Sequence, residues 1–206
     1  MKEKDTLAGK FWQKWVEGRD DYEAFSHLYN LYINDLLSYG ISLGFSEETC
    51  RDAAHDVFFK VFTEKKRLSA VKKPTAYLFR SFRNHLLNIQ KRQHRFAPDF
   101  TFETYPFTTE ITILDNLIDQ EEAQRLKNII KELLEELTPR QREAIYLRYM
   151  QEMEYEDIAA LLNMNANSAR RLVSRGIDNL RNKAINGDQL SFDVWLLWLL
   201  FASSKF

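Results

Sequence analysis

Apolar residues recur at helical spacing through the first half of the chain. One stripe predicts a helix that begins after residue 21 and ends near Gly40 and Gly44: Phe25, Leu28, Tyr29, Tyr32, Leu36, Tyr39 and Leu43. Ser46 opens the next predicted helix, and Glu47 and Glu48 suit its first turn. The predicted buried stripe of that helix is Cys50, Ala53, Ala54, Val57, Phe58, Val61 and Phe62. Its opposite face carries Asp52, His55, Asp56, Phe59 and Lys60, where the aromatic ring suits either a partner protein or packing on a neighbouring element.

A basic loop over residues 64–73 precedes a third helix, which Pro74 starts because a first-turn position needs no N–H. The apolar stripe of this helix is Leu78, Phe82, Leu86 and Ile89. Polar positions off the stripe are Arg80, Arg83, Asn84, Lys91 and Arg92, with Tyr77 and Phe79 near the start. Cations interleaved with aromatic rings suit single-stranded nucleic acid, since cations meet phosphates and rings stack on bases.

Residues 96–118 follow neither period and indicate an acidic, aromatic linker that rests on another part of the protein. Residues 115–137 then return to helical spacing. A short helix over 156–162 is broken at 163–165, and a second helix, capped by Asn165 or Asn167, runs to Lys183. The second helix is apolar at 169, 172, 173, 176/177 and 180, and its outward positions are Asn167, Ser168, Arg170, Arg171, Ser174 and Arg175.

Two helices in this order predict a helix-turn-helix whose second helix enters a DNA major groove. Arginine can bind guanine with two hydrogen bonds, and asparagine can bind adenine in the same way. The alternative is an ordinary helical bundle with solvated arginines.

The tail, residues 187–206, contains the apolar run Val194–Ala202. Nine residues are too few to span a membrane, which takes about 20. The run is apolar on every side, so we expect an apolar helix that docks on the protein's own domains, on a partner or on a membrane surface. We favour the first.

The formal net charge of −1 hides an uneven distribution. Residues 60–95 hold 11 Lys and Arg against one acid, and residues 96–137 hold ten acids against three bases. The single cysteine, Cys50, excludes an internal disulfide and a cysteine-based zinc site, which suits a reducing cytoplasm. No apolar run follows Met1–Asp5, so we expect no signal peptide.

The stretch from Leu137 to Ala144, then Tyr155–Ala159 and Ser168–Gly176, resembles region 4 of bacterial sigma factors of the sigma-70 family, extracytoplasmic-function type. Asp52–Phe58 and Tyr77–Asn84 resemble region 2 of the same class. The chain departs from the usual pattern at His55, Asp56, Phe82, Asn88, Ala169 and Gly176. Phe82 replaces a small residue, so it must find extra room in the core.

The resemblance implies a role for each group of residues. Asp52, His55, Asp56 and Phe59 would bind core RNA polymerase. The promoter −10 element would meet Arg67, Lys72, Lys73, Tyr77, Arg80, Arg83, Asn84, Lys91 and Arg92. The −35 element would meet the outward residues of the last helix: Asn167, Ser168, Arg170, Arg171, Ser174 and Arg175.

We therefore predict an all-α protein with a region 2-like bundle over 8–95, a linker over 96–118, a region 4-like helix-turn-helix domain over 119–186 and the tail over 187–206. It is a cytoplasmic sigma factor in transcription initiation, with no catalysis and no cofactor. Its predicted partners are the β′ clamp and β flap of core polymerase, promoter DNA and an anti-sigma factor, with no stable membrane span.

Two other functions remain open. His55-Asp56 resembles the paired ligands of HD-type metal-dependent phosphohydrolases, although that class needs further ligands and His85 and His94 lie in the basic helix. A helix-turn-helix regulator that acts without core polymerase would leave the basic segment 60–95 unexplained.

Overall fold

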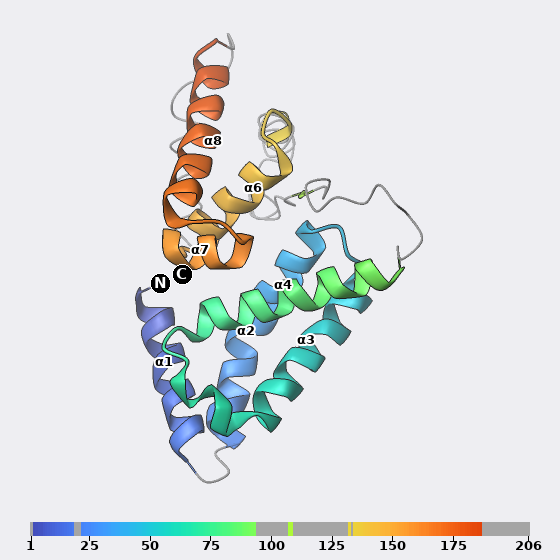
Figure 1. Cartoon of the computed structure of the whole chain (residues 1–206), viewed down its shortest axis with the longest axis vertical. Coiled ribbons are helices and arrows are strands. Elements are labelled where there is room, and N and C mark those ends of the chain that lie inside the picture. Colours follow the sequence, from blue (N-terminus) through green and yellow to red (C-terminus); the bar gives the residue numbers. More distant parts are fainter. Residues whose placement is uncertain (1, 19–21, 94–106, 109–131, 133, 187–206) are drawn as a thin grey trace, which may run out of the picture. The chain divides into compact units, whose positions relative to one another are not determined.

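The computed structural model describes residues 2–18, 22–93, 107–108, 132 and 134–186. Every regular element within these residues is a helix, which confirms the predicted all-α class (Figure 1). The chain divides into two compact units, Met1–Phe102 and Glu103–Phe206.

The described residues of the first unit form four α-helices and one short 3₁₀ segment. Their bounds are α1 Lys2–Glu17, α2 Tyr22–Ser42, α3 Glu47–Thr63, η1 Lys65–Ala70 and α4 Pro74–Gln93. Helix α2 packs against both α1 and α3, and α4 contacts all three of these helices (Figure 1). The core between them is rich in aromatic rings, and the largest fully buried side chains include Trp15, Tyr32, Tyr39, Phe79 and Phe82.

Helix α1 was not among the predicted helices, and it begins before residue 8, where the predicted first domain starts. Ala8, Trp12 and Trp15 are buried on its inner face. The two tryptophan rings contact each other edge-on with centroids 5.5 Å apart, and Trp15 also lies 5.7 Å from the ring of Phe25 in α2. The signal for this helix was present at the spacing of Ala8, Trp12 and Trp15, which is helical.

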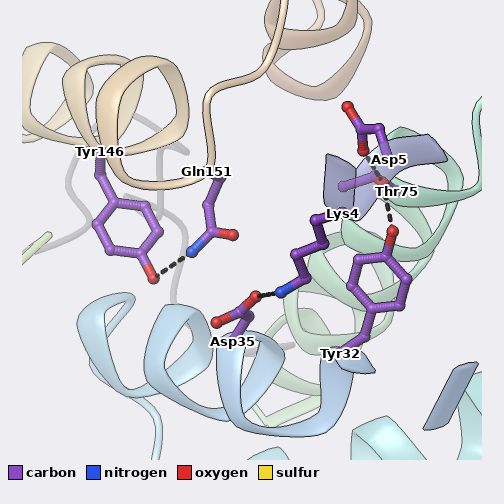
Figure 2. A network of polar contacts seen from close by, with 7 residues as sticks. All are labelled: Lys4, Asp5, Tyr32, Asp35, Thr75, Tyr146 and Gln151. Atoms are coloured by element: carbon purple, nitrogen blue, oxygen red, sulfur yellow. Dashed lines mark hydrogen bonds and ion pairs between the residues drawn. The ribbon is translucent and has the colours of Figure 1, made fainter. Parts of the chain in front are cut away.

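A polar network ties α1 to α2 and to the first turn of α4 (Figure 2). The Thr75 hydroxyl donates to Asp5 Oδ1 at 2.5 Å, so the Tyr32 hydroxyl is left to donate to Thr75 Oγ1. Lys4 pairs with Asp35 and lies 5.1 Å from the centre of the Tyr32 ring. Burial raises the pKa of Tyr32, so this hydroxyl stays protonated as a donor.

Gly40 was predicted to mark the end of α2, but it lies inside the helix, which continues to Ser42. Gly44, with φ of 86°, follows the end instead. Gly40 is a site of close approach: a Cβ there would lie 2.5 Å from Cys50 Sγ and 3.0 Å from Phe82 Cζ. The absent side chain of Gly40 is therefore what makes room for Phe82.

Helix α3 begins as predicted, because the Ser46 hydroxyl accepts a hydrogen bond from the Thr49 N–H at 3.2 Å. Its predicted stripe is buried at Cys50, Ala53, Ala54, Val57, Phe58 and Val61. The prediction was wrong for Phe62, which is 40% exposed and touches the rings of Tyr22 and Phe25 at the edge of the core.

The predicted basic loop over 64–73 was also wrong in part, since residues 65–70 form η1. Leu68 is buried beneath this turn. Lys65 donates to the carbonyl of Gly18, and its Nζ lies 5.6 Å from the centre of the Trp15 ring. These contacts fix the start of the basic segment to the end of α1.

The described helices of the second unit are α6 Pro139–Ile145, the π-helical η3 Tyr146–Met150, α7 Tyr155–Leu162 and α8 Ala166–Asn186. Thr138 caps α6 in a reciprocal arrangement: its hydroxyl accepts from the Gln141 N–H, and the Gln141 side chain accepts from the Thr138 N–H. Helix α8 packs against α6 and α7. The helix predicted over 115–137 lies almost wholly outside the described residues.

Tyr146, the first residue of η3, makes two side-chain contacts. Gln151 Nε2 donates to its hydroxyl at 3.1 Å, and both residues are buried (Figure 2). The ring of Phe107, 1% exposed, lies 5.5 Å from the Tyr146 ring. Phe107 belongs to the predicted linker, so this part of the linker does rest on the fold, as the aromatic composition indicated.

Among the described helices, none has both the length and the apolar character required to cross a membrane. The tail over 187–206 and its predicted helix lie outside the described residues.

Candidate nucleic-acid interface

The turn between α7 and α8 has a defined geometry. Asn163 adopts a left-handed conformation, with φ of 54°, and ends α7 as the predicted break requires. The Met164 N–H returns to the Ala159 carbonyl at 2.9 Å. Asn165, and not Asn167, caps α8, because its Oδ1 accepts from the Ser168 N–H at 2.8 Å.

A side chain from α6 also makes a hydrogen bond at the end of α7, just before this turn. Arg140 Nη2 donates at 2.9 Å to the carbonyl of Leu162, the last residue of α7. That carbonyl has no partner within a regular helix, so the bond fixes the end of α7 to α6. The start of α8 is therefore oriented by hydrogen bonds on both sides of the turn.

Helix α8 separates its faces sharply. Ala169, Val173, Gly176 and Leu180 are buried. The six predicted outward residues are all exposed: Asn167, Ser168, Arg170, Arg171, Ser174 and Arg175. The predicted division of this helix is confirmed, and the role of its exposed row in DNA contact remains a prediction.

Close packing holds α8 against α6. A Cβ placed on Gly176 would lie 2.7 Å from Ile145 Cδ1 and 3.5 Å from Gln141 Cβ. A small residue is therefore required here by contact with α6, and the two helices approach closely because Gly176 has no side chain.

The sequence did not predict a cluster of one aromatic ring and two arginines next to the exposed face of α8. The guanidinium carbon of Arg170 lies 5.2 Å from the centre of the Tyr155 ring, and that of Arg148 lies 4.8 Å from the same centre. Cations within about 6 Å of a ring centroid are attracted by the electron-rich face. The signal was weak in the sequence, because Arg148, Tyr155 and Arg170 come from three different elements.

In the first unit, most of the predicted −10 residues are on the surface. Arg80, Asn84, Lys91 and Arg92 are exposed along α4, and Lys72 and Lys73 are exposed in the segment before it. Arg67 is exposed on η1, where Nη1 lies 3.4 Å from Glu64 Oε2. The exposed cations of the first unit therefore follow one another along η1, the segment after it and α4.

Two positions of α4, Arg83 and Phe79, differ from the prediction. Arg83 was placed on the outward face, but it is only 8% exposed. Phe79 was considered for stacking on bases, but it is fully buried with its ring 5.4 Å from that of Tyr39. Tyr77 is partly buried, and its ring lies edge-on to Trp12 of α1 with centroids 5.9 Å apart.

The α3 face predicted to bind polymerase is exposed at Asp52, His55, Asp56 and Phe59. Phe59 is 70% exposed, which removes the alternative that it packs on a neighbouring element. His55 Nε2 lies 3.1 Å from the Tyr29 hydroxyl of α2, and Asp56 Oδ2 lies 3.2 Å from His85 Nε2 of α4. The sequence did not predict these two contacts.

The His55-Asp56 pair does not assemble a metal centre in the described part of the chain. No group of three or more His, Cys, Asp or Glu side chains gathers there in a way that suits a metal ion. The two residues instead direct their side chains to Tyr29 and His85, on different helices.

Comparison with known proteins finds a similarity within the second unit. Residues 127–180 match the family model described as Sigma-70, region 4, and this segment contains α6, η3, α7 and most of α8. No curated protein matches the chain. The second unit therefore contains a segment that is similar to region 4 of sigma-70 factors.

Proposed function

We propose that the chain is a sigma factor of the extracytoplasmic-function type, which binds core RNA polymerase and directs promoter recognition. The observation that carries this proposal is the exposed polar row of α8, presented by a capped turn within the region 4 segment. The protein acts by binding, and the chemistry of RNA synthesis belongs to the polymerase.

In this proposal, α8 enters the major groove at the −35 element. Its first turns carry Asn167, Ser168, Arg170 and Arg171, and the next turn carries Ser174 and Arg175. Base edges in the major groove accept hydrogen bonds from arginine and asparagine, and phosphates accept them from arginine and serine.

The first unit would act on the −10 element. The exposed cations of η1, of α4 and of the segment between them lie in one continuous stretch of chain, and they suit a displaced single strand. Extruding a base costs a few kcal/mol, least where pairing is weak. Arg83 is left out of this surface because it is buried.

Core polymerase would bind the exposed face of α3 through its β′ clamp. Asp52 and Asp56 supply charge and Phe59 supplies an apolar anchor that is already free of the core. The β flap, an anti-sigma factor and a cytoplasmic location complete the proposal. We further propose that the tail, residues 187–206, docks on the protein's own domains and restrains activity until polymerase displaces it.

The proposal is tested by reconstitution with purified core polymerase. The full chain is expected to co-purify with core polymerase and to select promoters, which are found by sequencing the bound DNA. Arg171→Ala and Arg175→Ala should each weaken −35 binding by about 1–3 kcal/mol if the contact is to a base. Unchanged promoter-directed transcription in both variants would show that α8 does not read the −35 element.

One observation favours a second candidate, a helix-turn-helix regulator that needs no polymerase: the family match lies within the second unit and leaves residues 1–126 unmatched. The same experiment separates the two candidates. A regulator would find its DNA sites without core polymerase, and Phe59→Ala would leave that binding intact. A sigma factor would require the polymerase, and Phe59→Ala would reduce assembly with it.

A further inference from the structure

The ring of Tyr155 receives two guanidinium groups from different elements. Arg148 of η3 and Arg170 of α8 lie 4.8 and 5.2 Å from its centre. Tyr155 is the first residue of α7 and is partly buried. It therefore links the element before the helix-turn-helix to the helix that follows the turn.

Arg148 is itself held in place. Its Nη1 donates to the carbonyl of Met153 at 2.8 Å and lies 3.5 Å from Glu154 Oε2. Met153 is buried, so the carbonyl belongs to a fixed part of the backbone. The order of contacts is Met153, Arg148, Tyr155 and Arg170, and each member restrains the next.

The ring contact distinguishes Arg170 from Arg171 and Arg175, the other two arginines on the exposed face of α8. In the described residues, Arg171 and Arg175 have neither a ring contact nor an ion pair, and all three side chains are exposed. A guanidinium that lies on a ring uses its face, and its N–H donors point outward along its edge. The Tyr155 ring therefore restrains the Arg170 guanidinium, whose side chain remains exposed to solvent.

We propose that Tyr155 is a positioning residue that holds Arg170 for contact with a DNA phosphate at the edge of the groove. This inference rests on the proposed function of α8 as the DNA-reading helix. Phosphate is the acceptor that we expect, because the guanidinium is always charged and phosphates are the anions that DNA presents along the groove.

The positioning is measured in the full chain without DNA. Relaxation of the arginine Nε–H groups by NMR reports the order of each side chain. Tyr155→Leu, which removes the ring, is expected to lower the order of Arg170 and leave that of Arg171 unchanged. Tyr155→Phe keeps the ring and should preserve the order of Arg170. An equally ordered Arg170 in Tyr155→Leu would overturn the inference, whatever the chain binds.

The consequence is measured with a random-sequence DNA duplex at low salt, because a phosphate contact does not depend on sequence. Tyr155→Leu should weaken binding about two- to fivefold, the range that corresponds to an exposed cation–π contact. Arg170→Ala should lower the slope of log K against log salt by about 1. Tyr155→Phe should bind like the natural chain.

A double-mutant cycle separates positioning from general damage to the fold. Tyr155→Leu should have little effect once Arg170 is alanine, and its full effect when Arg171 is alanine instead. Equal coupling to both arginines would overturn the inference. If the free chain binds the duplex too weakly to measure, the same variants are compared in the complex with core polymerase on promoter DNA. Failure of the natural chain to form that complex would refute the proposed function, while the NMR result still decides whether Tyr155 positions Arg170.

Discussion

Helix α4 of the first unit and helix α8 of the second, the two proposed to contact DNA, divide their residues differently. Helix α4 buries adjacent pairs at every turn: Leu78 and Phe79, Phe82 and Arg83, Leu86 and Leu87. Helix α8 buries a narrow row of small and medium residues, Ala169, Val173, Gly176 and Leu180. One reason is the number of neighbours: among the described elements, α4 contacts α1, α2 and α3, whereas α8 contacts α6 and α7.

The difference determines what mutations in each helix can reveal. A change on the exposed row of α8 alters binding with little effect on stability, because those side chains take no part in the core. A change on α4 affects folding where the residue belongs to the broad buried face, and affects function where the residue is exposed. The predictions below begin with the largest expected effect on the free energy of unfolding.

Phe82→Ala should cost the first unit about 3–5 kcal/mol, since a fully buried ring is removed. Cys50 reports on this unit, because burial raises the pKa of its thiol to about 11 from 9.0. The thiol therefore stays protonated and slow to alkylate near pH 8 until the unit opens. We expect faster alkylation of Cys50 in the variant.

The matched control is Phe59→Ala, which removes a ring that is 70% exposed and should change stability by less than about 0.5 kcal/mol. Hydrogen exchange at Leu147 and Val173 should be unaffected by Phe82→Ala if the second unit folds by itself. Loss of protection in both units together would contradict the division into two independently stable parts.

Gly40→Ala should cost the first unit about 1–3 kcal/mol by overpacking. The new methyl would lie 2.5 Å from Cys50 Sγ and 3.0 Å from Phe82 Cζ, so both must move. Cys50→Ala removes the nearer atom and should recover part of the loss in the double variant. Denaturant unfolding followed by tryptophan fluorescence measures this, with Trp195 and Trp198 replaced by phenylalanine so that Trp12 and Trp15 give the signal. A Gly40→Ala chain as stable as the natural one would show that Phe82 does not depend on the glycine.

Arg83→Ala should destabilise the first unit by about 1–2 kcal/mol, because the buried side chain contributes packing as well as charge. Arg80→Ala, on the exposed face, should leave stability within about 0.5 kcal/mol and impair promoter opening. Permanganate footprinting of the opened promoter, beside a polymerase pull-down, distinguishes the two. Normal stability in Arg83→Ala with loss of opening alone would restore Arg83 to the DNA surface.

The apolar stripes in the sequence predicted α2, α3, α4, α7 and α8, whereas α1, α6 and η3 were not predicted. Ser46 was predicted as a cap, and Asn165 was one of two predicted candidates, because a short polar side chain before an apolar stripe can accept from the first-turn N–H groups. Arg83 was misplaced because the prediction assumed a single narrow stripe, and a helix with three neighbours buries a wider one. The error at Phe62 was the opposite one: the prediction placed it in the buried stripe, but it lies at the margin of the core.

The contacts that join separate elements were beyond the sequence. Nothing in the spacing of Gly40 and Phe82, or of Arg148, Tyr155 and Arg170, shows that they meet, because a helical period describes one element at a time. The sequence did flag Phe82 as needing room, and the structure supplies it from another helix.

The smallest expected effect concerns Gly176, the counterpart in α8 of Gly40 in α2. A glycine inside a helix costs about 1 kcal/mol relative to alanine. Against that gain, the Cβ of Gly176→Ala would lie 2.7 Å from Ile145 Cδ1. That atom is the end of a flexible side chain, so the two effects should nearly cancel, and the variant should differ from the natural chain by less than about 1 kcal/mol.

Ile145→Val removes the Cδ1 atom that Gly176→Ala would meet. In that background, Gly176→Ala should stabilise the second unit by about 0.5–1 kcal/mol, because the gain in helix propensity is no longer offset. Thermal unfolding of the four chains of this cycle measures the coupling. If Gly176→Ala is equally neutral with and without the Cδ1 atom, contact with α6 is not what requires a small residue at position 176.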